Sequence, residues 1–247
     1  ILVRYSNDFS IWDLESVNHY KDQSDIFFTC HEFSYNKIAE AYEPYLGLIR
    51  QMFHRYCSGT LEEFMEECDV YKLQRPVFES YFENGFCERT EQILIDEVEY
   101  EQERMRNSIV TMLQKLSEIR PVVIVLNRFQ LASKSTMQLT NRLLQTKNKN
   151  IGIVLGVNDV QSIPEFAHEE WDAICESMDD RNMVYHIGNA GRNMEPDVMD
   201  YYSDYESDDG YRKLNNLVYF LDFDQADHHL SKIERRIKFD RICADTV

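Results

Sequence analysis

The chain has 247 residues, of which 43% are hydrophobic and 28% are charged, so it can bury the core of one large or two modest domains. Its 44 acidic and 26 basic residues give a net charge of −18, which leaves no overall surface for neutralising the phosphates of nucleic acid. No run reaches the roughly 18 apolar residues that a membrane span requires, and no secretory signal opens the sequence. The composition therefore predicts a soluble protein that binds neither free nucleic acid nor a membrane.

The six cysteines favour a cytoplasmic protein with reduced thiols. None of them forms a C-x-x-C pair, and none lies beside histidines at the spacing of a zinc site. The first residue is not methionine and the last residues have a helical pattern. We therefore expect the chain to be part of a longer protein and to hold no structural metal.

Five short apolar runs, rich in β-branched or aromatic residues, predict buried strands. They are Ile1–Arg4, Asp25–Cys30, Val122–Leu126, Ile151–Val157 and Met183–Ile187. The segments between them show helical periodicity, and parallel neighbours in a sheet need such crossover connections. The sequence therefore predicts an α/β fold with a five-stranded, mostly parallel sheet.

The connection between the second and third predicted strands is far longer than a single crossover. Within residues 35–120, apolar side chains recur at helical spacing in Asn36–Tyr56, Leu61–Tyr71 and Thr90–Ile119. This pattern predicts a long helical insertion between strands 2 and 3. A further helix is expected over Ile11–Tyr20, directly after the first strand.

The chain divides into three predicted regions. Residues 1–190 are expected to form the α/β domain with its insertion at 35–120. Residues 191–210 are predicted to be an acidic linker, because Glu195–Asp209 contains seven acidic residues and no basic one. Residues 211–247 carry apolar residues at helical spacing and predict the start of a helical, repeat-like region.

The segment Pro121–Leu144 is the most informative part of the sequence. Its apolar strand is followed by Asn127 and Arg128, then by the loop Phe-Gln-Leu-Ala and a serine-rich helix start, and the next strand ends at Asn158. This pattern resembles the Walker B strand and the elements after it in the STAND class of P-loop ATPases. These signalling relatives of AAA ATPases often precede tetratricopeptide repeats or output domains.

The resemblance implies a P-loop-type sheet, with ATP or ADP and Mg as the ligands of an intact family member. An unrelated α/β binding domain is an alternative interpretation. It would be indicated by a first strand at the sheet edge, rather than one flanked by the third and fifth strands.

In that family a phosphate loop of the form G-x-x-x-x-G-K-[ST] follows the first strand. In this chain Tyr5 and Ser10 take the glycine positions, Ile11 takes the lysine position and Trp12 takes the hydroxyl position, with Ser6, Asn7 and Asp8 between them. All four defining residues are replaced. At about 5 Å and an effective dielectric constant of about 20, Asp8 would repel a phosphate charge by about 3 kcal/mol.

The second half of the nucleotide site is altered as well. The acidic pair of the Walker B strand corresponds to Asn127 and Arg128, and the sensor position corresponds to Asn158. Asparagine has no charge with which to hold magnesium, and arginine cannot act as a base. We therefore predict a pseudo-ATPase with no catalytic residues and no nucleotide cofactor. The alternative is an active ATPase switch in which Arg4 or Arg128 reaches the phosphates of ATP or ADP.

The predicted partners are proteins. A domain without catalysis is expected to act as a regulatory or assembly module of a signalling protein, in contact with its own C-terminal helical region and possible further subunits. The strongly acidic composition favours a basic protein surface as the contact.

Overall fold

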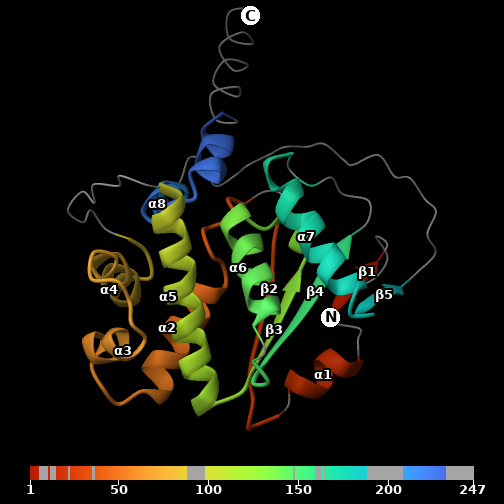
Figure 1. Cartoon of the computed structure of the whole chain (residues 1–247), viewed down its shortest axis with the longest axis horizontal. Helices are drawn as coiled ribbons and strands as arrows, with labels where there is room; N and C mark the ends of the chain where they lie inside the picture. The colour runs from red at the N-terminus through yellow and green to blue at the C-terminus, as the bar shows by residue number, and fades with distance from the viewer. Residues whose placement is uncertain are drawn as a thin grey trace, which may run out of the picture.

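The computed structural model describes residues 1–5, 11, 15–21, 23–34, 37–87, 98–146, 148–158, 163, 165–187 and 208–231. Five parallel strands form one sheet in the order β2-β3-β4-β1-β5 (Figure 1). The strands are β1 (Leu2–Tyr5), β2 (Phe27–Glu32), β3 (Val122–Asn127), β4 (Ile151–Asn158) and β5 (Val184–Ile187). All five predicted strands are confirmed, with bounds that differ by one or two residues.

Strand β1 lies inside the sheet, between β4 and β5. Val3 pairs with Gly156 on one side and with Tyr185 on the other. The expected position away from the sheet edge is confirmed, but the expectation that the third strand would be a neighbour of β1 was wrong. The chain leaves β3 and returns as β4 on the β1 side of β3, so β4 takes the place next to β1.

Helices cover both faces of the sheet (Figure 1). One face carries α5 (Val98–Ile119), α6 (Lys134–Gln145) and α7 (His168–Asp179), and the other carries α1 (Glu15–Lys21). Successive side chains of a strand point to opposite faces. Ile124 therefore packs in the large core with the helices of the first face, whereas Val125 packs with Ile11 and Val17 on the α1 face.

The long insertion between β2 and β3 is helical, as predicted. It contains α2 (Tyr45–Tyr56), α3 (Leu61–Glu67), α4 (Arg75–Asn84) and α5. The helix expected from residue 36 begins only after Pro44, because proline lacks the N–H that a helix interior requires. Helix α4 was not predicted, although Pro76 in its first turn and Gly85, with φ 80°, at its end are boundary signals. Residues 88–97 of the last predicted helix lie outside the described residues.

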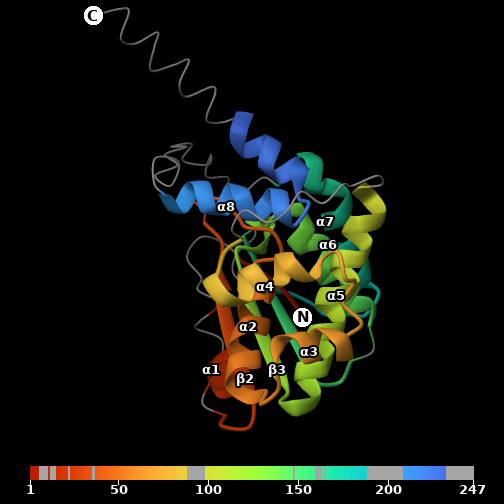
Figure 2. The same cartoon turned by 90° about the vertical axis from the view of Figure 1, so that its left-hand side faces the viewer.

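The C-terminal helices pack on this α/β domain. Helix α8 (Asp208–Tyr219) lies across the top of α4 and α6 in Figure 2, and a second helix follows over 223–231. Leu217 and Phe220 are fully buried in the same core as the sheet. Residues 188–207, with most of the predicted linker, and residues 232–247 lie outside the described residues. Within the described part of the chain, no helix has the length and apolar character needed to cross a membrane.

Candidate functional site

The candidate site lies at the carboxyl edge of the sheet, where open parallel α/β sheets bind their ligands. Three residues selected from the sequence end their strands there: Tyr5 ends β1, Asn127 ends β3 and Asn158 ends β4. Tyr5 pairs in register with Asn158. Strand order therefore brings the three residues to one edge, with β4 between β1 and β3.

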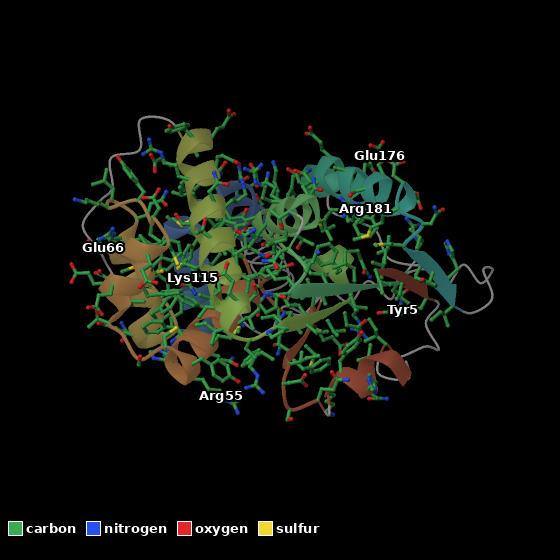
Figure 3. The ribbon with its side chains drawn as sticks, turned by 60° about the horizontal axis from the view of Figure 1, so that its bottom comes forward. Tyr5, Arg55, Glu66, Lys115, Glu176 and Arg181 are labelled. Atoms are coloured by element: carbon green, nitrogen blue, oxygen red, sulfur yellow. The ribbon has the colours of Figure 1, made fainter. Side chains whose placement is uncertain are left out.

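Tyr5 and Asn127 meet across β4 at a glycine. The Tyr5 hydroxyl donates a hydrogen bond of 2.5 Å to Asn127 Oδ1. A Cβ atom on Gly156 would lie 2.8 Å from Asn127 Oδ1 and 2.6 Å from Ile11 Cδ1, so only glycine leaves room for both side chains. We call Tyr5, Ile11, Asn127 and Gly156 the edge cluster. Figure 3 shows Tyr5 on the side of the sheet that faces α1.

Ile11 stands at the position that the motif comparison predicts for the lysine of a phosphate loop. Its side chain is 0% exposed and packs with Val17 of α1 and Val125 of β3. Tyr5, which the motif comparison predicts for the first glycine position, is buried beside it. The edge cluster thus places an apolar side chain and an aromatic ring where phosphate binding needs a cation and close backbone approach.

The edge cluster carries no charge at neutral pH. Burial raises the pKa of the Tyr5 hydroxyl, against the opposing effect of the positive charge of Arg128. The hydroxyl therefore stays protonated and can donate to Asn127, whose amide is uncharged. The side chains of the cluster are therefore neutral, and the positive charge that acts on Tyr5 comes from Arg128 outside the cluster.

The two arginines named as alternative phosphate ligands make other contacts. Arg4 Nη2 donates to Cys175 Sγ of α7 at 3.3 Å, on the opposite face of β1 from Tyr5. Arg128, with φ 53°, turns toward β2 and forms an ion pair with Glu32 at 3.4 Å. The structure therefore does not bring the two guanidinium groups together at the edge cluster.

Two residues at this edge were not selected from the sequence. Gln130, in the short helix η2 (Phe129–Leu131), is fully buried and its Oε1 accepts a hydrogen bond from the Asn158 N–H at 3.4 Å. Gly156 is the other. A glycine inside an apolar strand signals a close approach of neighbouring groups, and Gly152 in the same strand gives the same signal. Gln130 is part of the Phe-Gln-Leu-Ala loop that carries the family resemblance, so the sequence also gave a signal for it.

The remaining residues selected from the sequence are Ser6, Asn7, Asp8, Ser10 and Trp12. They lie outside the described residues. Their assignment to the altered phosphate loop stays a prediction.

The serine-rich start of α6 holds the insertion in place. Ser133 caps α6 by accepting from the Thr136 N–H, and its hydroxyl donates to the Glu40 carbonyl at 3.0 Å. The Thr136 hydroxyl donates to the Glu43 carbonyl at 3.1 Å. These hydroxyls therefore tie the first turn after β3 to the beginning of the helical insertion.

A cavity of about 200 Å³ lies between β2 and the start of α2. Its lining includes His31, Glu40, Glu43 and Tyr81. Glu43 Oε1 lies 3.4 Å from His31 Nε2, which favours the charged ring, but burial and the nearby Lys37 lower the pKa of His31 to about 4. His31 is therefore neutral at pH 7 and does not offset the negative charge of Glu43.

The neutral state of the partly exposed His31 predicts a loss of stability in mild acid. Because the pKa of His31 falls from 6.5 to about 4 on folding, the unfolded chain takes up the proton first as the pH drops. The free energy of unfolding should fall by roughly 3 kcal/mol on this account between pH 6.5 and 4, at about 1.4 kcal/mol for each unit of pKa shift. Urea unfolding of the wild type and of His31→Asn across this range measures the difference. Parallel pH profiles for the two proteins would contradict the prediction.

Within the part of the chain that the structure describes, no group of three or more His, Cys, Asp or Glu side chains is arranged to hold a metal ion. No family model matches the chain, and neither a curated protein nor a solved structure matches it. The interpretation of the edge cluster therefore depends on its own geometry and chemistry.

Proposed function

We propose that the chain is a degenerate P-loop ATPase-like domain that does not hydrolyse ATP and acts as a regulatory or assembly module of a larger signalling protein. The edge cluster carries this proposal, because Tyr5 and Ile11 are buried against Asn127 where a nucleotide site would need open, positively charged space. The parallel sheet with an interior β1 is consistent with a P-loop-type layout and supports it.

Two independent physical effects oppose nucleotide binding. A triphosphate at this edge would have to displace the Ile11 side chain from its apolar surroundings, and exposing such a side chain costs about 1.5–3 kcal/mol. The residue at the metal-binding position, Asn127, carries no charge and already accepts a hydrogen bond from Tyr5. A phosphate group therefore finds no lysine and magnesium finds no carboxylate, both of which an active site of this class supplies.

The rival function is a nucleotide-binding switch that uses Arg4 or Arg128 in place of the missing lysine. Arg128 is the stronger candidate, because its pair with Glu32 is partly exposed and such pairs contribute only about 0–1 kcal/mol. Arg4 would have to leave Cys175 and cross to the other face of the sheet. The proposed function therefore predicts no nucleotide binding, and the rival predicts binding that depends on Arg128.

A module without catalysis acts through contacts with other proteins. The net charge of −18 favours a basic surface on a partner protein. The contact of Phe220, directly after α8, with Phe78 and Tyr81 of α4 supports the C-terminal helical region as an intramolecular partner. We propose these two kinds of contact, with other subunits of the same signalling protein, as the means by which the module works.

Isothermal titration with ATP and with ADP, each with and without magnesium, tests the proposal. We expect no saturable heat up to millimolar nucleotide, which corresponds to a binding free energy weaker than about −4 kcal/mol. Micromolar binding would overturn the proposal and favour the switch. In that case Arg128→Ala, compared with Arg142→Ala in the last turn of α6, identifies whether Arg128 binds the phosphates.

A further inference from the structure

The two C-terminal helices meet at a tight turn that holds a leucine in a strained conformation. The Asp222 N–H donates to the Leu217 carbonyl at 2.8 Å and the Leu221 N–H donates to the Val218 carbonyl at 3.1 Å, which is the Schellman pattern of helix ends. Leu221 has φ 63°, a position usually taken by glycine, and this costs about 1 kcal/mol. We call Phe220–Asp222 the corner and residues 208–231 the C-terminal helix pair.

Phe220 is the apolar anchor of the corner. It is fully buried, and its ring centroid lies 5.8 Å from that of Phe78 and 5.7 Å from that of Tyr81, both on α4. The ring of Tyr42 lies at 6.1 Å, in an edge-to-face arrangement. Three rings of the insertion therefore surround one side chain of the C-terminal helix pair.

Asp222 is the polar anchor, and its two carboxylate oxygens cap two helices. Oδ2 accepts from the Ser135 N–H in the first turn of α6 at 3.1 Å, and Oδ1 accepts from the Gln225 N–H at the start of the helix over 223–231 at 3.3 Å. Both helix starts favour a negative charge. Asparagine has only one acceptor oxygen, so its NH₂ group would face one of the two N–H donors.

The contact beneath the corner is polar and incompletely packed. A cavity of about 40 Å³ lies there, lined in part by Tyr42, Arg106 and Asp222. One buried side-chain atom in its lining, Tyr42 Oη, has no hydrogen-bond partner among the described residues. The contact of the helix pair with α6 is therefore partly polar, beside the apolar contact of Phe220 with the core.

We infer that the C-terminal helix pair opens as a unit of its own and that the Asp222 carboxylate is the group that holds it closed. Opening exposes the rings of Tyr42, Phe78 and Tyr81 and releases the start of α6, which follows β3 through η2. The helix pair is thereby coupled to the same sheet edge as the edge cluster. The regulatory use of this opening rests on the proposed function, whereas the opening itself does not.

Amide hydrogen exchange of the whole chain, read by mass spectrometry, tests this inference. In Asp222→Asn we expect amides of residues 211–231 to exchange at least tenfold faster, and those of β3 and β4 to be unchanged. The control is Asp224→Asn, in the helix over 223–231. This change removes the 2.7 Å ion pair of Asp224 with Lys134, and the side chain of Asp224 is 56% exposed. Because exposed pairs contribute little, we expect a change of less than twofold in this variant.

Wild-type exchange at increasing, sub-denaturing urea gives a second test that needs no variant. Residues 211–231 should open at lower urea than β3 and β4. The inference is overturned if helices and strands exchange through one common opening, or if Asp222→Asn leaves residues 211–231 as protected as in the wild type. The nucleotide titrations do not affect either readout, so failure of the proposed function and failure of this inference are distinguishable.

Discussion

Ile11→Lys, which restores the residue type of a phosphate loop, is expected to lower the free energy of unfolding by about 3 kcal/mol or more. The side chain of Ile11 is fully buried among Val17 and Val125, and no acidic group of the edge cluster can pair with an ammonium group there. The variant is also expected to gain no affinity for ATP. Urea unfolding and isothermal titration of the same sample measure both effects.

Ile11→Met is the matched control, because it keeps the position apolar and changes its volume little. Such exchanges usually cost less than about 1.5 kcal/mol. If Ile11→Lys unfolds like the wild type and binds ATP with magnesium, the position is an open phosphate site and the proposed pseudo-ATPase is wrong. If the lysine variant loses much stability and the methionine variant loses little, the Ile11 side chain lies in apolar surroundings with Val17 and Val125.

Gly156→Ala is expected to destabilise the protein by about 1–3 kcal/mol through overpacking. The added Cβ would meet Ile11 Cδ1 at 2.6 Å and Asn127 Oδ1 at 2.8 Å. Neither atom is free to move aside, because Ile11 is fully buried and Asn127 is bound to the Tyr5 hydroxyl. Thermal or urea unfolding of the variant gives the cost.

Gly152→Ala in the same strand is the control. Its Cβ would lie 3.5 Å from the nearest atom, Val123 Cγ2, which is an ordinary contact, so we expect no loss of stability. A double-mutant cycle with Ile11→Val then tests the neighbour directly, since valine lacks the Cδ1 atom. The cost of Gly156→Ala should fall by at least about 0.5 kcal/mol in the valine background. Strictly additive costs would show that Ile11 does not lie against Gly156.

Ile11→Lys and Gly156→Ala both test the space beside Asn127. Ile11→Lys tests whether this space can accommodate a positive charge, and Gly156→Ala tests whether it is already filled by side chains. A domain that had kept its nucleotide would tolerate the first change better than the second. The edge cluster predicts that both are costly, because the site is filled by neutral side chains.

The sequence alone was sufficient for the secondary structure of the sheet. Strands such as β3 and β4 are buried on both faces, so they read as continuous apolar runs whatever their neighbours are. The helical character of the insertion could be predicted for a similar reason, since a helix that packs on one side repeats its apolar residues every three or four positions. The boundary at Pro44 was missed because the apolar period continues through a residue that backbone chemistry excludes from a helix interior.

Only part of the candidate site could be predicted from the sequence. Every defining residue of the phosphate loop is replaced, and the residue types alone predict the loss of phosphate binding and ATP hydrolysis. This prediction needs no knowledge of side-chain contacts. That Tyr5 bonds to Asn127, 122 positions away, follows from the order of the strands and from the missing side chain of Gly156 between them. No local pattern encodes a contact of this kind.

Local sequence patterns by themselves predicted the strands, most of the helices and the charges that the site lacks, because hydrophobic period and side-chain chemistry act within a few residues. Tertiary structure alone decided that β4 lies between β1 and β3, that Ile11 fills the space beside Asn127, and that Phe220 and Asp222 join the C-terminal helix pair to the domain. These contacts join residues far apart along the chain. Their geometry depends on the path of the whole backbone and on the volumes that meet there.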